Sequence, residues 1–367
     1  MLRITEVKLS LDHAEEDLHA AIIKRLGIVS EDLLKYTIFR RAIDARKRSK
    51  IHLIYTLDVE LRDESNVFEK RKKRNPNSNL SKSPDISYHF VAHAPKELNR
   101  RPVVIGTGPC GLFAGLLLAQ MGFNPIIVER GKIVRERTQD TWGLWRKSIL
   151  NPESNVQFGE GGAGTFSDGK LYSQIKDPRF IARKVLTEFV KAGAPKEILY
   201  LAKPHIGTFR LVGIVEKMRA TIESLGGEFR FQNQVTDLLI KDGQVRGVEL
   251  AGGEMLDTDH AVLAVGHSAR DTFKMLHQRG VFIEAKPFSI GFRIEHPQSL
   301  IDRVRWGDFA GNKLMGAADY KLVHHCKNGR SVYSFCMCPG GTVVAATSEE
   351  GHVVTNGMSQ YSRNERN

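Results

Sequence analysis

The chain has 367 residues, more than one ordinary hydrophobic core accommodates, so two or three domains are expected. Its 41% hydrophobic and 26% charged residues are typical of a globular protein. No stretch approaches the roughly 20 apolar residues of a membrane-spanning helix, and the N-terminus lacks the apolar block of a signal peptide. We therefore expect a cytoplasmic protein without a membrane partner. Four cysteines are too few for a disulfide scaffold.

The formal net charge of +12 is concentrated in two basic runs, Arg40–Lys50 and Glu69–Arg74. Such a surface can attract nucleic acid or another polyanion. Neither run contains interleaved aromatic residues for base stacking, so solvated surface is the favoured interpretation. The nucleic-acid hypothesis predicts binding that weakens steeply with salt and is lost when residues 40–74 are deleted.

Residues 1–95 are predicted to form a small α+β domain with the order β-α-β-β. The charged, Asn- and Ser-rich residues 62–85 are interpreted as a basic linker or flexible loop, because they offer little apolar surface to bury. Ile86–Ala92 is expected to form one further strand. The periodicity predicts strands, a helix and a helical turn, in chain order, at Leu2–Leu11, Ala14–Leu26, Ser30–Asp32, Tyr36–Ala45 and Ile51–Leu61.

The second domain, residues 96–285, opens with a strand, a glycine turn, a helix and a second strand. These are Val103–Ile105, the sequence Gly106-Thr107-Gly108-Pro109-Cys110-Gly111, Pro109–Met121 and Pro125–Val128. Together they have the order of one βαβ unit. The expected later helices and strands are Phe180–Ala192, Leu211–Leu225, Phe229–Phe231, Val235–Lys241, Gln244–Leu250 and His260–Val265.

The glycine turn matches the dinucleotide fingerprint G-x-G-x-x-G in its required context. Gly106 permits the tight turn, Gly108 lets the main chain approach a pyrophosphate, and Gly111 lets the helix pack on the strand. The helix, which begins with Pro109 and Cys110, offers the free N–H groups of its N-terminus to phosphates. Glu129, 18 positions beyond Gly111 (129 − 111), is predicted to accept hydrogen bonds from ribose hydroxyls.

Three features favour FAD over NAD as the dinucleotide. Glu129 followed by Arg130 resembles the first Rossmann unit of glutathione-reductase-like flavoproteins. Val235 enters a strand where those proteins place a main-chain contact to adenine. The strand ending at Ala264-Val265-Gly266 resembles their apolar strand with a terminal glycine.

More widely, the chain resembles a bacterial family of FAD-dependent oxidoreductases. The matching stretches are VVIGTGPCGLFAGLLLAQMGFNPIIVERG, VQFGEGGAGTFSDGKL, FSIGFRIEHPQ, YSFCMCPGGTVVAATSEEG and VTNGMS. The resemblance implies noncovalent FAD in an extended form, with Gly161, Gly162, Ala163 and Gly164 near its pyrophosphate and flavin. Family members look considerably longer, so we expect a C-terminally truncated chain whose β-rich substrate-type domain, residues 286–367, is incomplete.

The predicted fold is therefore α/β: a Rossmann-type three-layer FAD-binding domain with an inserted α+β substrate-type domain and a small N-terminal α+β domain. The predicted function is an FAD-dependent oxidoreductase that transfers hydride, with its substrate and electron acceptor open. A second fingerprint for NAD(P)H is absent, so that donor, if used, would reach the flavin from a less specialised pocket. The alternatives are an RNA-binding or RNA-modifying flavoprotein and a flavin-binding remnant without turnover.

Catalytic candidates are weak. Lys170 follows the glycine loop and could stabilise an anionic reduced flavin, although Asp168-Gly169 is more simply a turn. Arg293 and Glu295 share a face of an expected strand, where a surface ion pair is favoured over an anion site. Cys336 and Cys338 have neither zinc-knuckle nor C-x-x-C spacing, so packing beside Pro339 is favoured over a redox role. No metal-ligand cluster is recognisable.

Overall fold

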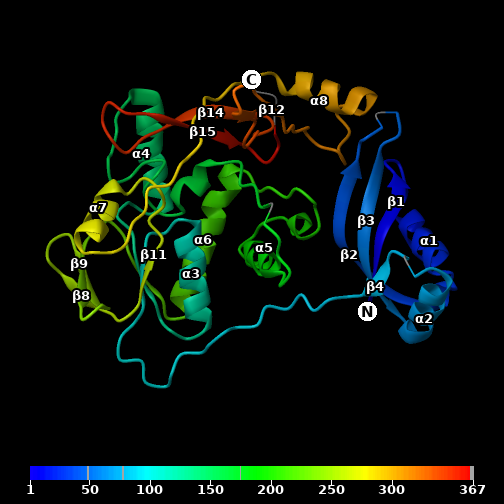
Figure 1. Cartoon of the computed structure of the whole chain (residues 1–367), viewed down its shortest axis with the longest axis horizontal. Coiled ribbons are helices and arrows are strands. Elements are labelled where there is room, and N and C mark those ends of the chain that lie inside the picture. The colour runs from blue at the N-terminus through cyan, green and yellow to red at the C-terminus, as the bar shows by residue number, and fades with distance from the viewer. Residues whose placement is uncertain (48, 77, 174, 364–367) are drawn as a thin grey trace.

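The computed structural model describes residues 1–47, 49–76, 78–173 and 175–363. It contains a small N-terminal sheet and a larger α/β body, joined by a long extended segment at residues 83–102 (Figure 1). The parallel sheet of the larger body carries the candidate site.

The N-terminal sheet is antiparallel, with strand order β2-β3-β1-β4. Helix α1 (Glu15–Leu26) buries Leu18, Ile22 and Leu26 against it. Gly27 ends the helix in the left-handed conformation (φ 61°) that glycine adopts without strain. The predicted strands, helix and helical turn η1 (Ser30–Asp32) are confirmed. The four strands are β1 (Leu2–Ser10), β2 (Leu33–Asp44), β3 (His52–Leu61) and β4 (Leu80–Lys82).

The predicted linker at residues 62–85 is wrong. It contains helix α2 (Glu64–Arg74) and strand β4. The side chain of Asp63 caps α2 by accepting from the amide of Asn66, and four basic residues in the last turn complement the helix dipole. Val67 and Phe68 pack on the N-terminal core, and Arg71 Nε donates to the Leu26 carbonyl at 2.8 Å. Capping and two apolar contacts thus order a segment whose composition suggests disorder.

The strand expected at Ile86–Ala92 is also absent: these residues are extended but pair with no strand among the described residues. The rings of Tyr88 and Phe90 instead pack edge to face, with centroids 5.2 Å apart. The ammonium group of Lys184 lies 5.3 and 5.1 Å from their centroids. Cation–π contacts therefore hold this segment against the larger body.

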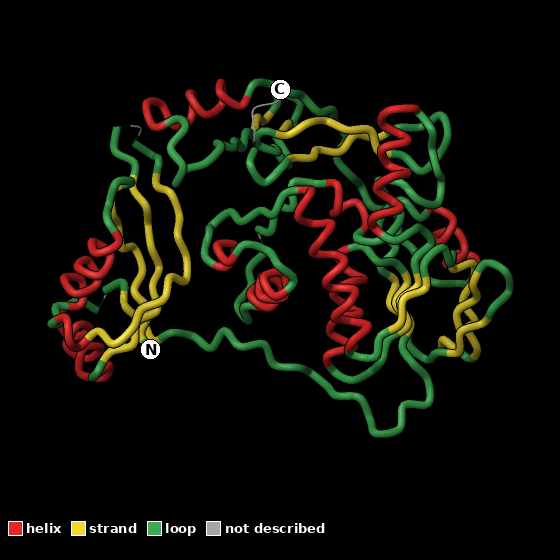
Figure 2. The backbone as a smooth tube through the Cα atoms, turned by 180° about the vertical axis from the view of Figure 1, so that it is seen from behind, coloured by secondary structure: helices red, strands yellow, loops and turns green. Residues whose placement is uncertain are grey.

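The larger body is built on a parallel sheet with order β11-β5-β6-β7. Val104 of β5 joins the cluster formed with two helices, whereas Val103 and Ile105 face an antiparallel sheet on the other side. Three layers result (Figure 2). The parallel strands are β5 (Val103–Ile105), β6 (Ile126–Val128), β7 (Glu228–Arg230) and β11 (Ala261–Leu263). The outer layers comprise α3 (Pro109–Gln120) and α6 (Thr208–Ser224) on one face, and β8 (Val235–Lys241), β9 (Gln244–Leu250), β10 (Met255–Asp257) and α7 (Arg270–Gln278) on the other.

A long excursion between β6 and β7 supplies the remaining helices of this body. The predicted helix at Phe180–Ala192 is confirmed as α5. The glycine-dense stretch before it forms a folded loop with one helical turn, η2, which lies against α6. Besides α6, the segment between β6 and β7 contains α4 (Val134–Lys147), η2 (Gly162–Phe166), α5 (Ile181–Lys191) and η3 (Lys196–Leu199).

The strand expected to carry Arg293 and Glu295 does not form. Residues 281–297 form no regular element, and Phe288, Ile290 and Phe292 are 85–94% exposed. Their alternation suits a strand, but no strand among the described residues pairs with them. Trp306, in a helix that the pattern did not predict, packs into the N-terminal core. The C-terminal elements are α8 (Gln298–Trp306), η4 (Gly307–Phe309), β12 (Val323–His325), β13 (Ser331–Tyr333), β14 (Gly341–Ala346) and β15 (Val354–Ser359).

Within the described residues, none of the helices combines the length and apolar character needed to cross a membrane.

Candidate functional site

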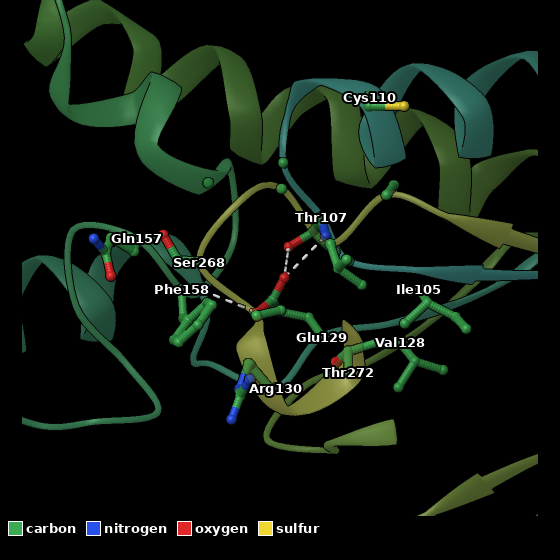
Figure 3. A pocket seen from close by; sticks show the side chains of 18 of the residues that line it. Ile105, Thr107, Cys110, Val128, Glu129, Arg130, Gln157, Phe158, Ser268 and Thr272 are labelled. Atoms are coloured by element: carbon green, nitrogen blue, oxygen red, sulfur yellow. Dashed lines mark hydrogen bonds between the residues drawn. The ribbon is translucent and has the colours of Figure 1, made fainter. Parts of the chain in front are cut away.

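A cavity of about 390 Å³ opens at the carboxyl ends of β5, β6 and β11. The chain runs from β5 to β6 on one side and places β11 on the other, so the strand order reverses at β5. Open parallel sheets bind ligands at such reversal points. Figure 3 shows Glu129, Arg130, Phe158 and Thr272 gathered around the cavity. Its wall consists of residues 105–110, 128–130, 157–159, 162–164, 233–235, 263–269 and Thr272.

The fingerprint glycines have different physical reasons to be glycine. Gly106 has φ 101°, and a Cβ there would lie 2.5 Å from the Ala264 carbonyl oxygen. A Cβ on Gly111 would collide with the Gly106 carbonyl oxygen. Gly108 differs: its φ is an ordinary −63°, and an added Cβ would come no closer than 3.9 Å, to Gly162 Cα. The fold therefore requires glycine at positions 106 and 111. It does not require glycine at position 108, which faces the cavity.

A second glycine-rich loop, residues 159–164, crosses the start of α3. Gly162 has φ 57°, and a Cβ on it would lie 2.8 Å from Gly108 Cα. Ala163 and Gly164 also line the cavity, whereas Gly161 lies behind it and donates its N–H to the Thr107 carbonyl at 2.9 Å. Of the residues predicted to bind the cofactor, only Gly111 and Gly161 are not part of the wall.

The N-terminus of α3 gives the cavity its electrostatic character. Gly108 is the N-cap and Pro109 the first helical residue, and the first turn contains no acidic side chain. The first N–H groups of a helix have no partner within it, and they point along the positive end of the helix dipole. An anionic group in this part of the cavity would therefore meet main-chain donors, as the fingerprint predicts.

Glu129 is buried and already fully engaged within the chain. Its Oε2 accepts from the Thr107 N–H at 2.9 Å and from the Thr107 hydroxyl at 2.6 Å. Its Oε1 accepts from the amides of Gly131 at 2.9 Å and Gly159 at 3.0 Å. A carboxylate has about four acceptor positions, so all are used. A ribose hydroxyl can bind Glu129 only if one donor turns away, and the Thr107 hydroxyl is the one that can rotate.

Arg130 braces the rim of the cavity. Its guanidinium pairs with Glu153 at 2.7 Å and with Asp271 of α7 at 3.1 Å. It also lies 4.3 Å from the ring centroid of Phe158. Its charge is thus matched by two carboxylates, which suits Arg130 to holding the rim together rather than to binding phosphate.

Arg137 is a supporting residue that the sequence did not reveal. It is fully buried in α4, where its guanidinium donates to the carbonyls of Asn155, Val156 and Glu160 at 2.7, 2.8 and 2.6 Å. Burial lowers its pKa to about 10, against the raising influence of Glu129 and Glu160. The charged sequence around it is typical of an exposed helix face, and no periodicity separates Arg137 from its exposed neighbour Arg135.

Glu160 lies beneath the glycine loop and is fully buried. Its Oε2 accepts from the Val134 amide at 2.7 Å, and its Oε1 is 2.9 Å from Arg219 Nε. The Arg219 contact is an ion pair by distance but lacks hydrogen-bond geometry. Burial raises the pKa of Glu160, while the Val134 amide and Arg219 act in the opposite direction. Glu160 and Arg137 together fix the loop that carries Gly162.

The cavity wall also contains the other predicted residues, Val235, Ala264 and Gly266. The amide of Ala264 donates to the Ile105 carbonyl at 2.9 Å, which continues the pairing of β11 with β5. Sequence reasoning missed the residues directly after β11. Carboxyl ends of parallel strands share one edge of a sheet, and that rule could have found them. The missed wall residues here are Asn233, His267, Ser268, Ala269 and Thr272.

Neither weak catalytic candidate is part of the cavity wall. Lys170 donates to the Met337 carbonyl, far along the chain. Arg293 Nε donates to the Thr355 carbonyl at 3.2 Å, and Glu295 accepts from the Val343 amide at 2.5 Å. The favoured Arg293–Glu295 ion pair is therefore wrong, because the β14–β15 hairpin offers each side chain a main-chain partner.

Asp168 is more than a turn residue. It is buried, its carboxylate accepts from the Ser359 hydroxyl, and it pairs with Arg363 at 3.3 Å. Gly169 does have the positive φ, 65°, of a turn. Asp168 thus anchors the end of β15 to the loop that follows η2.

The fold is α/β, with a cavity at the carboxyl ends of its parallel strands. Residues 287–367 match a family model described as "FAD-dependent protein, C-terminal domain-like", and residues 1–60 match a domain of unknown function. An uncharacterized protein of Clostridium beijerinckii is 44% identical over 367 residues, covering 99% of this chain and 67% of that protein. The chain belongs to the same family as this Clostridium protein.

Solved structures resemble the chain more distantly. THI4 of Thermovibrio ammonificans is 17% identical, with a TM-score of 0.35 over 50% of this chain and 64% of that one. Glycine oxidase of Bacillus cereus is 15% identical, with a TM-score of 0.34 over 50% of this chain and 59% of that one. The chain thus spans less than two thirds of either protein, and likeness at these TM-scores is too weak to bear on chemistry.

Proposed function

We propose that this chain is an oxidoreductase that binds FAD noncovalently, with the ADP half lying between the start of α3 and the loop after β11. The observation that carries the proposal is Gly108. Its backbone is in an ordinary conformation, and an added Cβ would find room within the protein. The position faces the cavity, and a pyrophosphate in close contact with the main chain would leave no space for a side chain.

The rest of the cavity suits this ligand. Main-chain N–H groups at the start of α3 can bind the pyrophosphate, and the close contact of Gly108 with Gly162 leaves bare backbone beside it. The Thr107 hydroxyl, which bonds to Glu129, can rotate to admit a ribose hydroxyl. Val235, which is expected to contact adenine through its main chain, lines the same cavity. The fit therefore rests on main-chain groups and one carboxylate.

FAD, when bound, supplies two-electron chemistry at its isoalloxazine ring. The chain's part is to hold the ADP half and to fix the glycine loop through Arg137 and Glu160. We further propose dehydrogenase chemistry with hydride transfer, and NAD(P)H as one candidate donor. The cavity has one fingerprint, so a nicotinamide would have to approach the flavin without a second Rossmann unit.

The test compares two Gly→Ala variants. Gly108→Ala should fold as the parent does, yet bind FAD at least about tenfold more weakly, because its methyl group occupies the pyrophosphate position. Gly213→Ala is the matched control: Gly213 lies within α6, and a Cβ there meets nothing within 4 Å. This control should bind FAD normally and be slightly more stable. Binding is measured by quenching of flavin fluorescence on titration.

Equal FAD affinity for the two alanine variants would refute the placement of the pyrophosphate. Anaerobic mixing of the FAD-loaded protein with NADH and with NADPH then tests the donor. Bleaching of the flavin absorption by one nucleotide identifies it, and no bleaching with either removes nicotinamide from the proposal.

A further inference from the structure

A second cluster of reactive groups lies outside the FAD cavity, where Lys170 meets the segment Cys336–Cys338. The ammonium group of Lys170 donates to the Met337 carbonyl and lies 3.8 Å from Cys336 Sγ and 3.9 Å from Cys338 Sγ. Cys336 is exposed and Cys338 half-buried. One cation is thus shared by two thiols that are two residues apart.

The backbone is shaped around these sulfurs. Cys336 has φ 55°, a left-handed conformation that costs a non-glycine residue energy and recurs at functional sites. Gly357 of β15 lies opposite, where a Cβ would come 3.0 Å from Cys338 Sγ and 2.9 Å from a guanidinium nitrogen of Arg293. The absence of a side chain at Gly357 therefore lets Cys338 and Arg293 approach the same spot. Two cations flank the thiol pair.

The two thiols have different proton affinities. A hydrogen bond from Cys338, reinforced by the charges of Lys170 and Arg293, lowers the pKa of Cys336 to about 6, although burial opposes the shift. The same hydrogen bond, together with burial, raises the pKa of Cys338. These opposite shifts favour a thiolate at Cys336, which is exposed, and a thiol at Cys338, which is less exposed. A nucleophile beside a protonated second cysteine is the arrangement that thiol–disulfide exchange needs.

We propose that Cys336 and Cys338 form a dithiol site that reduces low-molecular-weight disulfides. The Cys336 thiolate attacks one sulfur of R–S–S–R, forming a mixed disulfide and releasing R–S⁻, which takes up a proton. The Cys338 thiol then loses its proton and attacks Cys336 Sγ, expelling the second R–S⁻. The products are two R–SH and a Cys336–Cys338 disulfide, so the two electrons that the small disulfide gains come from the protein dithiol.

Geometry favours exchange over a permanent crosslink. A disulfide between cysteines separated by a single residue closes a short ring around Met337, which departs from relaxed disulfide geometry. Disulfides strained in this way are readily reduced. A metal site is not favoured, since the described residues bring no third His, Cys, Asp or Glu into a ligand cluster here.

The experiment uses 2-hydroxyethyl disulfide as the probe and peptide mass spectrometry as the readout, on the full chain with or without FAD. The parent protein should lose two hydrogens across Cys336 and Cys338 and carry no adduct there. Cys338→Ser should accumulate one mixed disulfide at Cys336, in which the added group is S–CH₂CH₂OH. Cys110 and Cys326, read in the same samples, serve as internal controls because each lacks a neighbouring thiol in the sequence.

A second measurement tests the role of the cations. The rate of Cys336 alkylation by iodoacetamide should rise with a midpoint near pH 6 in the parent protein. Cys338→Ala should raise the midpoint most, and Lys170→Met by about one pH unit, which is a tenfold change in thiolate at low pH. A purely structural Lys170 would not move this profile.

Stable adducts on both cysteines of the parent protein would overturn the proposal, as would no reaction at either. A midpoint for Cys336 above pH 8 would also overturn it. None of these readouts depends on flavin chemistry, so the dithiol can fail while the FAD proposal stands, and the reverse.

Discussion

Replacing Glu129 with glutamine should destabilise the glycine turn even before any ligand binds. The carboxylate accepts four hydrogen bonds, at 2.9, 2.6, 2.9 and 3.0 Å, and three of them come from main-chain amides. A glutamine side chain has one carbonyl oxygen and one NH₂ group. It can accept at most about two of the four bonds, and its NH₂ group then faces two donors.

The size of the effect follows from these bonds. A hydrogen bond to a charged group contributes about 1.5–3 kcal/mol, and a buried donor left without an acceptor costs about 1–3 kcal/mol. With two bonds lost in a site where Glu129 is only 5% exposed, we expect Glu129→Gln to lower the free energy of unfolding by about 3–5 kcal/mol. Thr107→Val removes only the hydroxyl donor and should cost about 1 kcal/mol.

Urea unfolding followed by tryptophan fluorescence measures the change, since Trp142 and Trp145 lie in α4 beside the site. Glu136→Gln is the matched control, because it makes the same substitution at an exposed residue of α4, the helix that contains both tryptophans. It should change the stability by less than about 0.5 kcal/mol. Glu129→Gln and Glu136→Gln variants of equal stability would show that the four bonds do not hold the turn together.

Three further changes test the supports of the site. Gly162→Ala should weaken FAD binding more than Gly213→Ala, because its Cβ would lie 2.8 Å from Gly108 Cα; flavin titration measures both. Arg137→Lys keeps the charge but loses the planar fork that donates to three carbonyls, so unfolding should need about 2–4 kcal/mol less free energy, measured in urea. Burial lowers the pKa of His205 below 6.5 in the folded protein. The unfolded chain therefore takes up the proton more readily than the folded one. As a result, His205 contributes stability at high pH that is lost as the pH falls through its folded pKa. His205→Gln should therefore lose less in melting temperature than the parent between about pH 7 and about pH 5, and an equal loss would contradict this reasoning.

Local sequence rules predicted the βαβ unit because its signals are short-range. The apolar run 103–105, the three glycines and Glu129 lie within thirty residues, and each acts on its neighbours. The same rules failed where the decisive contact is distant. Nothing near Val67 and Phe68 indicates that they pack on the N-terminal core, so charge alone suggested a linker where α2 forms.

The functional residues divide in the same way. Ala264 and Gly266 were predicted because they end an apolar strand, whereas Arg137 was missed because its three partners are main-chain carbonyls, which no pattern of residue types indicates. Lys170 was a weak candidate for a residue near the flavin because it follows the glycine loop. Its contact with Met337 joins residues 167 positions apart, and no local sequence pattern indicates a contact over that distance.

The crossing of Gly108 and Gly162 has a consequence for the order in which the protein matures. The two residues are 54 positions apart (162 − 108), and the excursion that contains α4 separates them. Closing a loop of that length costs chain entropy that local contacts do not offset. An isolated β5–α3–β6 unit would therefore contain Gly108 but not Gly162. The proposed pyrophosphate site would be complete only after residue 162 has folded against the start of α3. We expect cofactor loading to be a late event, coupled to completion of the domain rather than to formation of its first turn.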